Sequence, residues 1–98
     1  MAILSFKSAA TEDINSGRVS KSALRLLPKP LHKLAQIKLA RLSAATSLSD
    51  LQDLRGNRLE ALKGDRKGRF SIRINDQYRP CFRWIDKHAL DVKIFEYH

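Results

Sequence analysis

Apolar residues recur along the chain at two intervals, one typical of helices and the other of strands. From Pro30 to about Ala45 they recur every three or four positions, which predicts a helix with one buried face. Pro30 suits the first helical position because that position needs no amide hydrogen. A short capped turn is expected to follow over Ser47–Leu54. The opposite helix face, expected to meet solvent, carries Lys29, His32, Lys33, Gln36 and Ser43.

The segments before this helix have weaker signals. Residues Ala2–Lys7 alternate weakly between apolar and polar positions and predict a first strand. Ser8 can cap a short helix over Ala9–Asn15, and Gly17 can end it. The stretch Arg18–Lys29 is polar, then leucine-rich, then interrupted by proline, so a loop or an irregular turn is expected there.

In the second half of the chain the period changes to two. "RFSIRIN" (69–75) and "YRPCFRW" (78–84) alternate apolar and polar residues, and the turn residues Asn75, Asp76 and Gln77 stand between them. "LDVKIFEY" (90–97) predicts a last strand and "RLEALK" (58–63) an earlier one. These strands predict an antiparallel sheet.

The apolar residues define how the strands pair. A slip of one residue would turn every side chain to the other face, so the register that keeps apolar residues together is strongly preferred. With the turn at 75–77, that register puts Phe70 opposite Phe82 and Ile72 opposite Pro80. Because Pro80 has no amide hydrogen, a bulge or the end of the neighbouring strand is expected beside it.

The same register gathers basic residues on the other face. It puts Arg69 opposite Arg83 and Arg73 opposite Arg79. Like charges directly opposite each other destabilise a sheet by roughly a few tenths of a kcal/mol, so two such pairs predict a face that binds an anion. The parity assigns Leu90, Val92 and Ile94 to the apolar face. It assigns Asp91, Lys93, Phe95 and Tyr97 to the arginine face, which Lys63 joins if it pairs near Arg69.

Composition limits the class of protein. A chain of 98 residues with 43% hydrophobic residues is expected to fold as a single domain over residues 1–98, with a core that needs no metal or disulfide. The single Cys81 is typical of a reducing compartment. No apolar run is long enough to span a membrane, and the first residues do not resemble a signal peptide. A cytoplasmic protein is therefore expected, with no membrane partner.

The charge points to a polyanionic partner. Nineteen Lys and Arg residues against ten Asp and Glu give a net charge of +9, which favours nucleic acid or an acidic protein. Residues 1–54 hold eight basic and four acidic residues, and residues 55–98 hold eleven and six. The excess is thus spread along the chain, which excludes a simple basic tail.

Cleavage of a phosphodiester needs positive groups on the phosphate oxygens together with a base and an acid. Lys63, Arg73 and Arg79 can supply the positive charge. The acid–base candidates are Tyr97, His98, Glu60 and Glu96. A tyrosine among cations should have a lowered pKa and could deprotonate a ribose hydroxyl, a group that RNA has and DNA lacks. Such a reaction needs neither a metal nor another cofactor.

Plainer interpretations exist for several of these residues. Tyr97 could simply pack at the edge of the sheet, and His98 could be a frayed terminal residue. Cys81 is expected to fill space, and His32 and His88 to lie on the surface. The three histidines and one cysteine have no spacing typical of metal ligands. "GDRKG" (64–68) is expected to be a hairpin connection that offers Arg66 and Lys67 to a phosphate backbone.

Four stretches together resemble a known family. They are "ILSFKS" (3–8), "KLARLSAATSLSDL" (38–51), "GNRLEALKGDRKGRFSIRINDQYRPCFRW" (56–84) and "DVKIFEYH" (91–98). Their combination is similar to the HigB toxins of the RelE and ParE superfamily. The similarity covers nearly the whole chain except the proline-containing segment Arg18–Pro30.

The resemblance implies a toxin of a toxin–antitoxin pair. Such toxins are ribosome-dependent endonucleases that cut mRNA and are silenced by a helix-turn-helix antitoxin called HigA. Their catalytic face includes the lysine of "LKG", the arginine of "QYR" and the tyrosine before the terminal histidine, here Lys63, Arg79 and Tyr97. Some members carry a histidine where this chain has Glu60, so the general base stays open among Tyr97, Glu60 and His98.

The expected protein is an α+β domain with the RelE-like fold, in which two helices cover one face of a twisted antiparallel sheet. Lys63 and Arg79 would stabilise the scissile phosphate with help from Arg73. The residues expected to bind RNA or its phosphates are Arg66, Lys67, Arg69, Arg83 and Lys93.

Two other functions remain open. One is a ParE-like toxin that poisons DNA gyrase without cutting nucleic acid. The other is a non-catalytic RNA-binding module, which would need exposed aromatic residues for base stacking. Only Phe95 and Tyr97 are candidates for that stacking.

Overall fold

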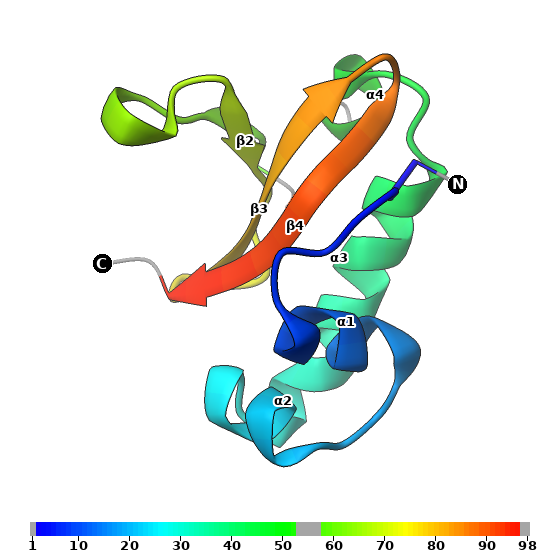
Figure 1. The fold of residues 1–98 in the computed structure, drawn as a ribbon, viewed down its shortest axis with the longest axis vertical. Helices are drawn as coiled ribbons and strands as arrows, with labels where there is room; N and C mark the ends of the chain where they lie inside the picture. The colour runs from blue at the N-terminus through cyan, green and yellow to red at the C-terminus, as the bar shows by residue number, and fades with distance from the viewer. Residues whose placement is uncertain (1, 53–57, 97–98) are drawn as a thin grey trace.

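The fold combines one sheet with helices on one side of it. A computed structural model describes residues 2–52 and 58–96. The described strands form an antiparallel sheet in the order β1-β2-β3-β4, of which Figure 1 labels β2, β3 and β4. The strands are β1 (Glu60–Ala61), β2 (Arg69–Ser71), β3 (Tyr78–Ile85) and β4 (His88–Glu96). The helices are α1 (Ala9–Ser16), α2 (Lys21–Leu26), η1 (Lys29–Leu31), α3 (His32–Ala44), α4 (Leu48–Gln52) and η2 (Gly64–Arg66).

The predicted first strand is present only as two separate bridges. Ile3 pairs in parallel with Ala89, and Phe6 pairs in parallel with Val92. Main-chain hydrogen bonds, such as that from Lys7 N to Val92 O at 2.9 Å, hold the segment along the free edge of β4. The N-terminal segment therefore extends the sheet beyond β4, which brings Lys7 beside the last strand.

The capping residues of α1 act as predicted. The Ser8 hydroxyl accepts a hydrogen bond from the Thr11 amide, and Gly17 ends the helix with a left-handed backbone (φ +78°). Within the predicted capped turn at Ser47–Leu54, residues Leu48–Gln52 form the short helix α4, and residues 53 and 54 lie outside the described residues. Hydrogen bonds from Thr46 to the Asp50 carboxylate lower the pKa of Asp50.

The expectation of an irregular turn over Arg18–Lys29 is wrong, because the segment contains helix α2. The Ser20 hydroxyl caps α2 by accepting a hydrogen bond from the Ala23 amide at 3.1 Å. The leucine-rich sequence that follows buries Ala23 and Leu27 completely. Pro30 lies in the 3-10 turn η1, so regular α-helix starts at His32.

The two histidines predicted to lie on the surface do not project freely into solvent. His32 is only 7% exposed, and its Nε2–H donates to the Leu27 carbonyl oxygen at 2.7 Å. This bond joins the start of α3 to the end of α2. His88 is partly buried, and its Nδ1 has no hydrogen-bond partner within the described part of the chain. The exposed face of α3 includes Ile37, Ala40 and Ala44.

The predicted register of the central strands is confirmed. Phe70 pairs with Phe82, and Arg69 pairs with Arg83. A hydrogen bond from Ile72 N to Pro80 O at 3.2 Å continues that register beyond the end of β2. Strand β2 stops at Ser71, one residue before the position opposite Pro80, where the missing amide hydrogen interrupts the ladder.

A bulge in β4 changes the predicted faces near the start of that strand. Lys93 lies opposite Cys81 but Leu90 lies opposite Arg83, so β4 contains one extra residue there. Asp91 takes the left-handed conformation (φ +54°) found in one class of such bulges. Leu90 therefore shares the face of Arg83 and not the apolar face. Val92 and Ile94 are buried as predicted.

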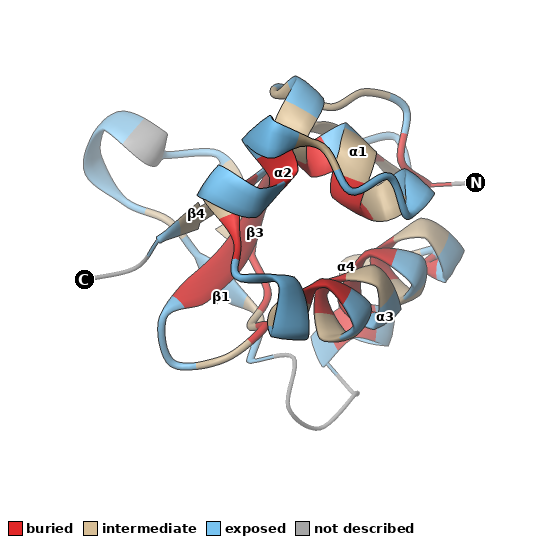
Figure 2. Ribbon diagram, turned by 90° about the horizontal axis from the view of Figure 1, so that it is seen from below, coloured by how far each residue is buried: buried red, intermediate tan, exposed pale blue. Residues whose placement is uncertain are grey.

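The core fills the space between the sheet and the helices, as the buried segments in Figure 2 show. Fully buried core residues include Ile14, Leu39, Leu42, Phe82 and Ile94. None of the helices in residues 2–52 and 58–96 has the length and hydropathy needed to cross a membrane.

One buried hydroxyl joins α1 to the sheet. Thr11 is completely buried, and its Oγ1 accepts a hydrogen bond from Ile94 N at 3.1 Å. The N-terminal segment bonds β4 only as far as Val92, so the Thr11 hydroxyl continues the pairing of the strand edge. It thereby replaces a backbone partner for a buried amide.

Replacing Thr11 with valine, which keeps the shape and removes the hydroxyl, should leave the Ile94 amide unsatisfied. We expect the free energy of unfolding to fall by about 1–3 kcal/mol, measured by urea denaturation. Ser16→Ala, which removes an exposed hydroxyl from the same helix, should change stability by less than about 0.5 kcal/mol. Equal stability of Thr11→Val and the wild type would show that the hydroxyl is not needed.

Candidate functional site

The sheet surface opposite the core is defined here as the polar face. Strand pairing places Glu60 beside Ser71, Ser71 beside Cys81, and Cys81 beside Lys93. Arg79 lies opposite Phe95 on the same face. The polar face includes Glu60, Arg69, Ser71, Arg79, Cys81, Arg83, Lys93 and Phe95, together with Leu90 opposite Arg83.

Arg79 is a buried cation held by several protein groups. The residue is 7% exposed, and its Nε donates to Ser71 Oγ at 2.9 Å. Its Nη2 donates to the main-chain oxygens of Ser71 and Arg58. A buried charge is tolerated only when it is hydrogen-bonded and paired, and these contacts meet that need. They also fix the guanidinium in one orientation on the polar face.

Glu60 supplies the counter-charge. Its carboxylate Oε2 lies 3.3 Å from Arg79 Nη2, and its side chain is 50% exposed. Strand β1 is short, but its pairing of Glu60 with Ser71 is enough to bring this carboxylate to Arg79. The structure thus brings together two of the predicted site residues, one catalytic and one auxiliary. Because the Glu60 carboxylate is half-exposed, water screens this ion pair, and we expect it to contribute at most about 1 kcal/mol to stability.

Lys63 lies just beyond the end of β1. The predicted strand over residues 58–63 is regular only at Glu60–Ala61, although Leu62 N still donates to Arg69 O at 2.9 Å. Lys63 is exposed and precedes η2. The strand pairing therefore no longer assigns it to a face of the sheet.

Arg73 lies outside the regular β2–β3 ladder. Its guanidinium forms an ion pair with Asp76 in the turn between these strands. Burial lowers the pKa of Lys38 on α3, and the positive charges of Arg41 and Arg73 lower it further. The charge of Arg73 thus acts on Lys38 of α3 as well as on its ion-pair partner Asp76.

The remaining predicted residues divide into three groups. Tyr97 and His98 lie outside the described residues. Arg66 belongs to η2, and Lys67 follows it as an exposed residue. Arg83 forms an ion pair with Asp91 at 3.3 Å, whereas Arg69 and Lys93 line a small hollow.

That hollow has a volume of about 110 Å³. Sequence reasoning did not include Lys7, which is one of its lining residues. The alternation of Ala2–Lys7 gave a strand signal but did not show which strand the segment would join. The other lining residues are Arg69, Cys81, Lys93 and Phe95.

A hollow of about 410 Å³ is lined by Asp65, Lys67, Gly68, Arg69, Arg83 and Ile85. It lies beside the η2 connection and contains two of the predicted phosphate-binding residues, Lys67 and Arg69, together with Arg83. The Asp65 carboxylate also lines it, so its charge is mixed.

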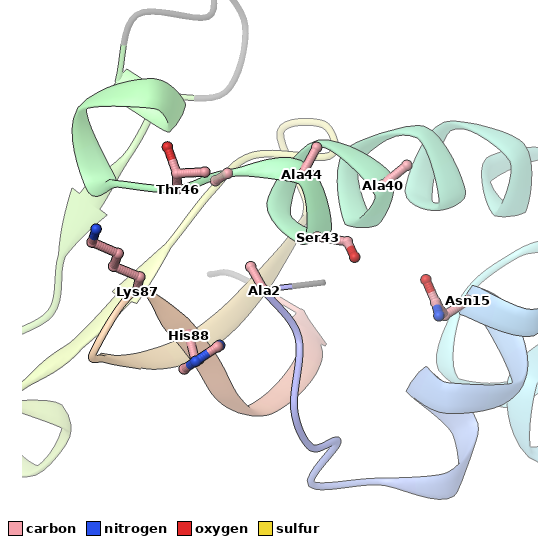
Figure 3. A pocket seen from close by; sticks show the side chains of 9 residues that line it. Ala2, Asn15, Ala40, Ser43, Ala44, Thr46, Lys87 and His88 are labelled. Atoms are coloured by element: carbon pink, nitrogen blue, oxygen red, sulfur yellow. The ribbon is translucent and has the colours of Figure 1, made fainter.

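A larger hollow of about 720 Å³, shown in Figure 3, is lined by none of the residues named for the polar face. Small side chains of α3 and Ala2 line one part, and Lys87 and His88 of the β3–β4 hairpin line another. It contains neither Arg79 nor Glu60. Among the described residues, no group of His, Cys, Asp and Glu side chains is arranged to hold a metal ion. The polar face is the better candidate for phosphate chemistry because it contains the fixed Arg79 guanidinium.

Removing the Ser71 hydroxyl should test how Arg79 is held. In Ser71→Ala, the buried Nε of Arg79 loses its acceptor, and we expect the free energy of unfolding to fall by about 1.5–3 kcal/mol. Glu60→Gln keeps the shape of the half-exposed partner and should cost less than about 1 kcal/mol. Urea denaturation measures both. A larger loss for Glu60→Gln than for Ser71→Ala would contradict this ranking.

Known proteins with similar sequences and structures place this chain in a family. The family model for the RelE-like toxin of the type II toxin–antitoxin system HigB matches residues 19–98. Toxin HigB-1 of Vibrio cholerae serotype O1 is 46% identical over 67 residues, which cover 68% of this chain and 70% of that protein.

A solved structure supports the same fold. In the YoeB dimer from Staphylococcus aureus, the matched chain has a TM-score of 0.61 with 21% identity, and the match covers 100% of this chain and 99% of that one. At this identity the match establishes the α+β fold alone. Together with the family match, it confirms the expected RelE-like architecture. The chain therefore belongs to the HigB-like family of RelE-like toxins and is a toxin of a type II toxin–antitoxin system, a class that implies an antitoxin partner.

Proposed function

We propose that this toxin is a ribosome-dependent endoribonuclease that cleaves mRNA and so inhibits translation, and that residues 1–98 form one toxin domain. The observation that carries the proposal is Arg79, a guanidinium fixed on a sheet face rich in cations. Preorganised positive groups favour a reaction in which negative charge develops on phosphate oxygens. Membership of the HigB-like family supports the same activity.

In the proposed reaction, a ribose 2′-hydroxyl loses its proton to a base and its oxygen attacks the adjacent phosphorus. The bond from phosphorus to the 5′-oxygen of the next nucleotide breaks, and that oxygen takes up a proton from an acid. The products are a 2′,3′-cyclic phosphate and a free 5′-hydroxyl. The nucleophile belongs to the RNA, so the reaction needs neither a cofactor nor a covalent intermediate with the protein.

Lys63 and Arg79 would stabilise the charge on the phosphate oxygens, and Arg73 would assist. Tyr97 is the proposed general base, with Glu60 and His98 as the alternatives. The contact between Glu60 and Arg79 favours a positioning role for Glu60, because this carboxylate already holds the guanidinium at 3.3 Å. A phosphate that approaches Arg79 would then share the guanidinium with Glu60 or displace it.

The proposed partners follow from this activity. A HigA-like helix-turn-helix antitoxin would silence the toxin, and the ribosome would present the mRNA. The toxin would act in the cytoplasm, where ribosomes translate. Arg66, Lys67, Arg69, Arg83 and Lys93 would contact RNA phosphates, and such contacts weaken as salt concentration rises.

Substitution of the proposed catalytic groups should abolish mRNA cleavage and growth arrest. We expect Lys63→Ala and Tyr97→Phe each to lower cleavage by about 100-fold or more, because each removes charge stabilisation or proton transfer. Arg79→Ala should do the same, with its folding checked separately because Arg79 is buried. Mapping mRNA ends after induction in a bacterium measures the effect, and Lys33→Ala on the exposed surface of α3 is the control.

Cleavage that persists in all three variants would refute the assignment of the catalytic residues. Toxicity of the wild type without mRNA cleavage would favour a ParE-like gyrase poison instead.

The role of Glu60 can be separated from that of Tyr97. If Glu60 positions Arg79, Glu60→Gln should retain cleavage within about 10-fold of the wild type, because the amide can still accept a hydrogen bond. If Glu60 is the general base, the same variant should lose about 100-fold or more. Single-turnover cleavage of mRNA on purified ribosomes distinguishes the two outcomes.

A further inference from the structure

The small hollow on the polar face, here called the basic cup, joins four separate segments. It is lined by Lys7 of the N-terminal segment, Arg69 of β2, Cys81 of β3, and Lys93 and Phe95 of β4. Phe6 pairs with Val92, so the next residues, Lys7 and Lys93, are neighbours across the strand edge. Cys81 lies opposite Lys93 and is 6% exposed, which puts it at the floor of the cup.

The cations of the basic cup differ from the arginines around them in their ion pairs with carboxylates. Arg73, Arg79 and Arg83 are each paired with a carboxylate. Within the described part of the chain, no ion pair includes Lys7, Arg69 or Lys93. Arg69 even lies directly opposite another arginine, Arg83. The sheet thus compensates the neighbouring arginines and leaves positive charge concentrated around one hollow, which an anion would relieve.

The size and the wall of the basic cup narrow the choice of anion. Its volume of about 110 Å³ is small beside the hollows of about 410 Å³ and 720 Å³ elsewhere on the protein. A hollow of this size lined by three cations suits a small anionic group such as a single phosphate. Phe95 is half-buried and forms one wall, so its ring can stack with a base that lies outside the cup. A ligand with a phosphate in the cup and an unpaired base on Phe95 would be a nucleotide of single-stranded RNA, because the bases of a duplex are not free to stack on a side chain.

The cup adjoins the proposed cleavage site. Phe95 lies opposite Arg79, and Cys81 follows Arg79 by two residues on the same face of β3. Two residues advance a strand by about 6.6 Å, a distance comparable with that between successive phosphates of an extended single strand. A strand of RNA with one phosphate at Arg79 can therefore present the next phosphate to the basic cup.

We propose that the basic cup is a binding subsite for single-stranded RNA, in which Lys7, Arg69 and Lys93 hold a phosphate that flanks the cleaved one and Phe95 stacks with the attached base. This inference rests on the proposed function, because it assumes that RNA crosses the polar face. It adds Lys7 as a phosphate-binding residue and Phe95 as a base-stacking residue. It also proposes that Arg69 and Lys93 bind the same phosphate.

The test is the affinity of the toxin for a short, fluorescently labelled single strand of 2′-O-methyl RNA, which cannot be cleaved by attack of the ribose hydroxyl. Co-expression with the antitoxin, followed by removal of the antitoxin under denaturing conditions and refolding of the toxin, avoids toxicity. Fluorescence anisotropy at several salt concentrations then gives the affinity and its salt dependence. Lys7→Ala and Lys93→Ala should each weaken binding, and loss of the phosphate contact should reduce the slope of log affinity against log salt by about 0.7.

Phe95→Leu should lower affinity about 10-fold with little change of that slope, because it removes stacking but no charge. Lys33→Ala, which removes an equal charge from the exposed surface of α3, should leave both the affinity and the slope close to those of the wild type. Thermal unfolding of each variant checks the fold. If Phe95→Leu is unstable, the affinities of Lys7→Ala and Lys93→Ala decide the result, because both lysines are exposed and their replacement should not disturb the fold.

The outcomes separate this inference from the proposed nuclease activity. A wild type that does not cleave mRNA on ribosomes, but whose RNA binding is weakened by the cup substitutions, would refute the nuclease proposal and support the cup as a phosphate-binding and base-stacking site for RNA without cleavage. A wild type that cleaves, with cup variants that bind and cleave equally well, would overturn the subsite. Cup variants that bind RNA normally but lose the antitoxin would also overturn it, because the cup would then serve acidic groups of the antitoxin.

Discussion

The register of β3 is the constraint on which the rest of the structure depends. This strand pairs with β2 on one side and β4 on the other, so its alternation assigns the faces of three strands at once. Phe82 faces the core and stacks on Phe70, with ring centroids 6.3 Å apart. A slip of one residue would bury Arg83 in place of Phe82. The cost of an unpaired buried charge and the loss of aromatic burial both favour the observed pairing.

Once this register is set, the polar face must accommodate several cations. The structure does so by placing a carboxylate beside some of them: Glu60 from β1 reaches Arg79, and Asp91 from the β4 bulge reaches Arg83. Both carboxylates come from irregular or short parts of the sheet, where local backbone geometry differs from the ideal ladder. The distribution of uncompensated charge therefore depends on these irregularities, and the proposed RNA subsite lies where they supply no carboxylate.

Arg79 illustrates how one residue can serve both the fold and a proposed reaction. Its contacts with Ser71, Glu60 and the Arg58 carbonyl tie β1 to the two strands that follow. These contacts satisfy a charge that would otherwise be costly to bury, and they also hold the guanidinium rigidly. Preorganisation of this kind is an advantage in charge stabilisation, because little further ordering is needed when substrate binds.

Local signals in the sequence determined much of this protein: the caps of α1, the α3 pattern, the central strands with their register, and an interruption of the ladder beside Pro80. Each follows from neighbouring residues or from strict alternation. Tertiary structure alone decided the rest. Helix α2 and the buried His32 depend on packing of the leucine-rich segment, and the face of Leu90 depends on a bulge. Lys7 lies beside Lys93 only because the N-terminal segment pairs with β4. This contact joins distant parts of the chain, so local periodicity does not encode it.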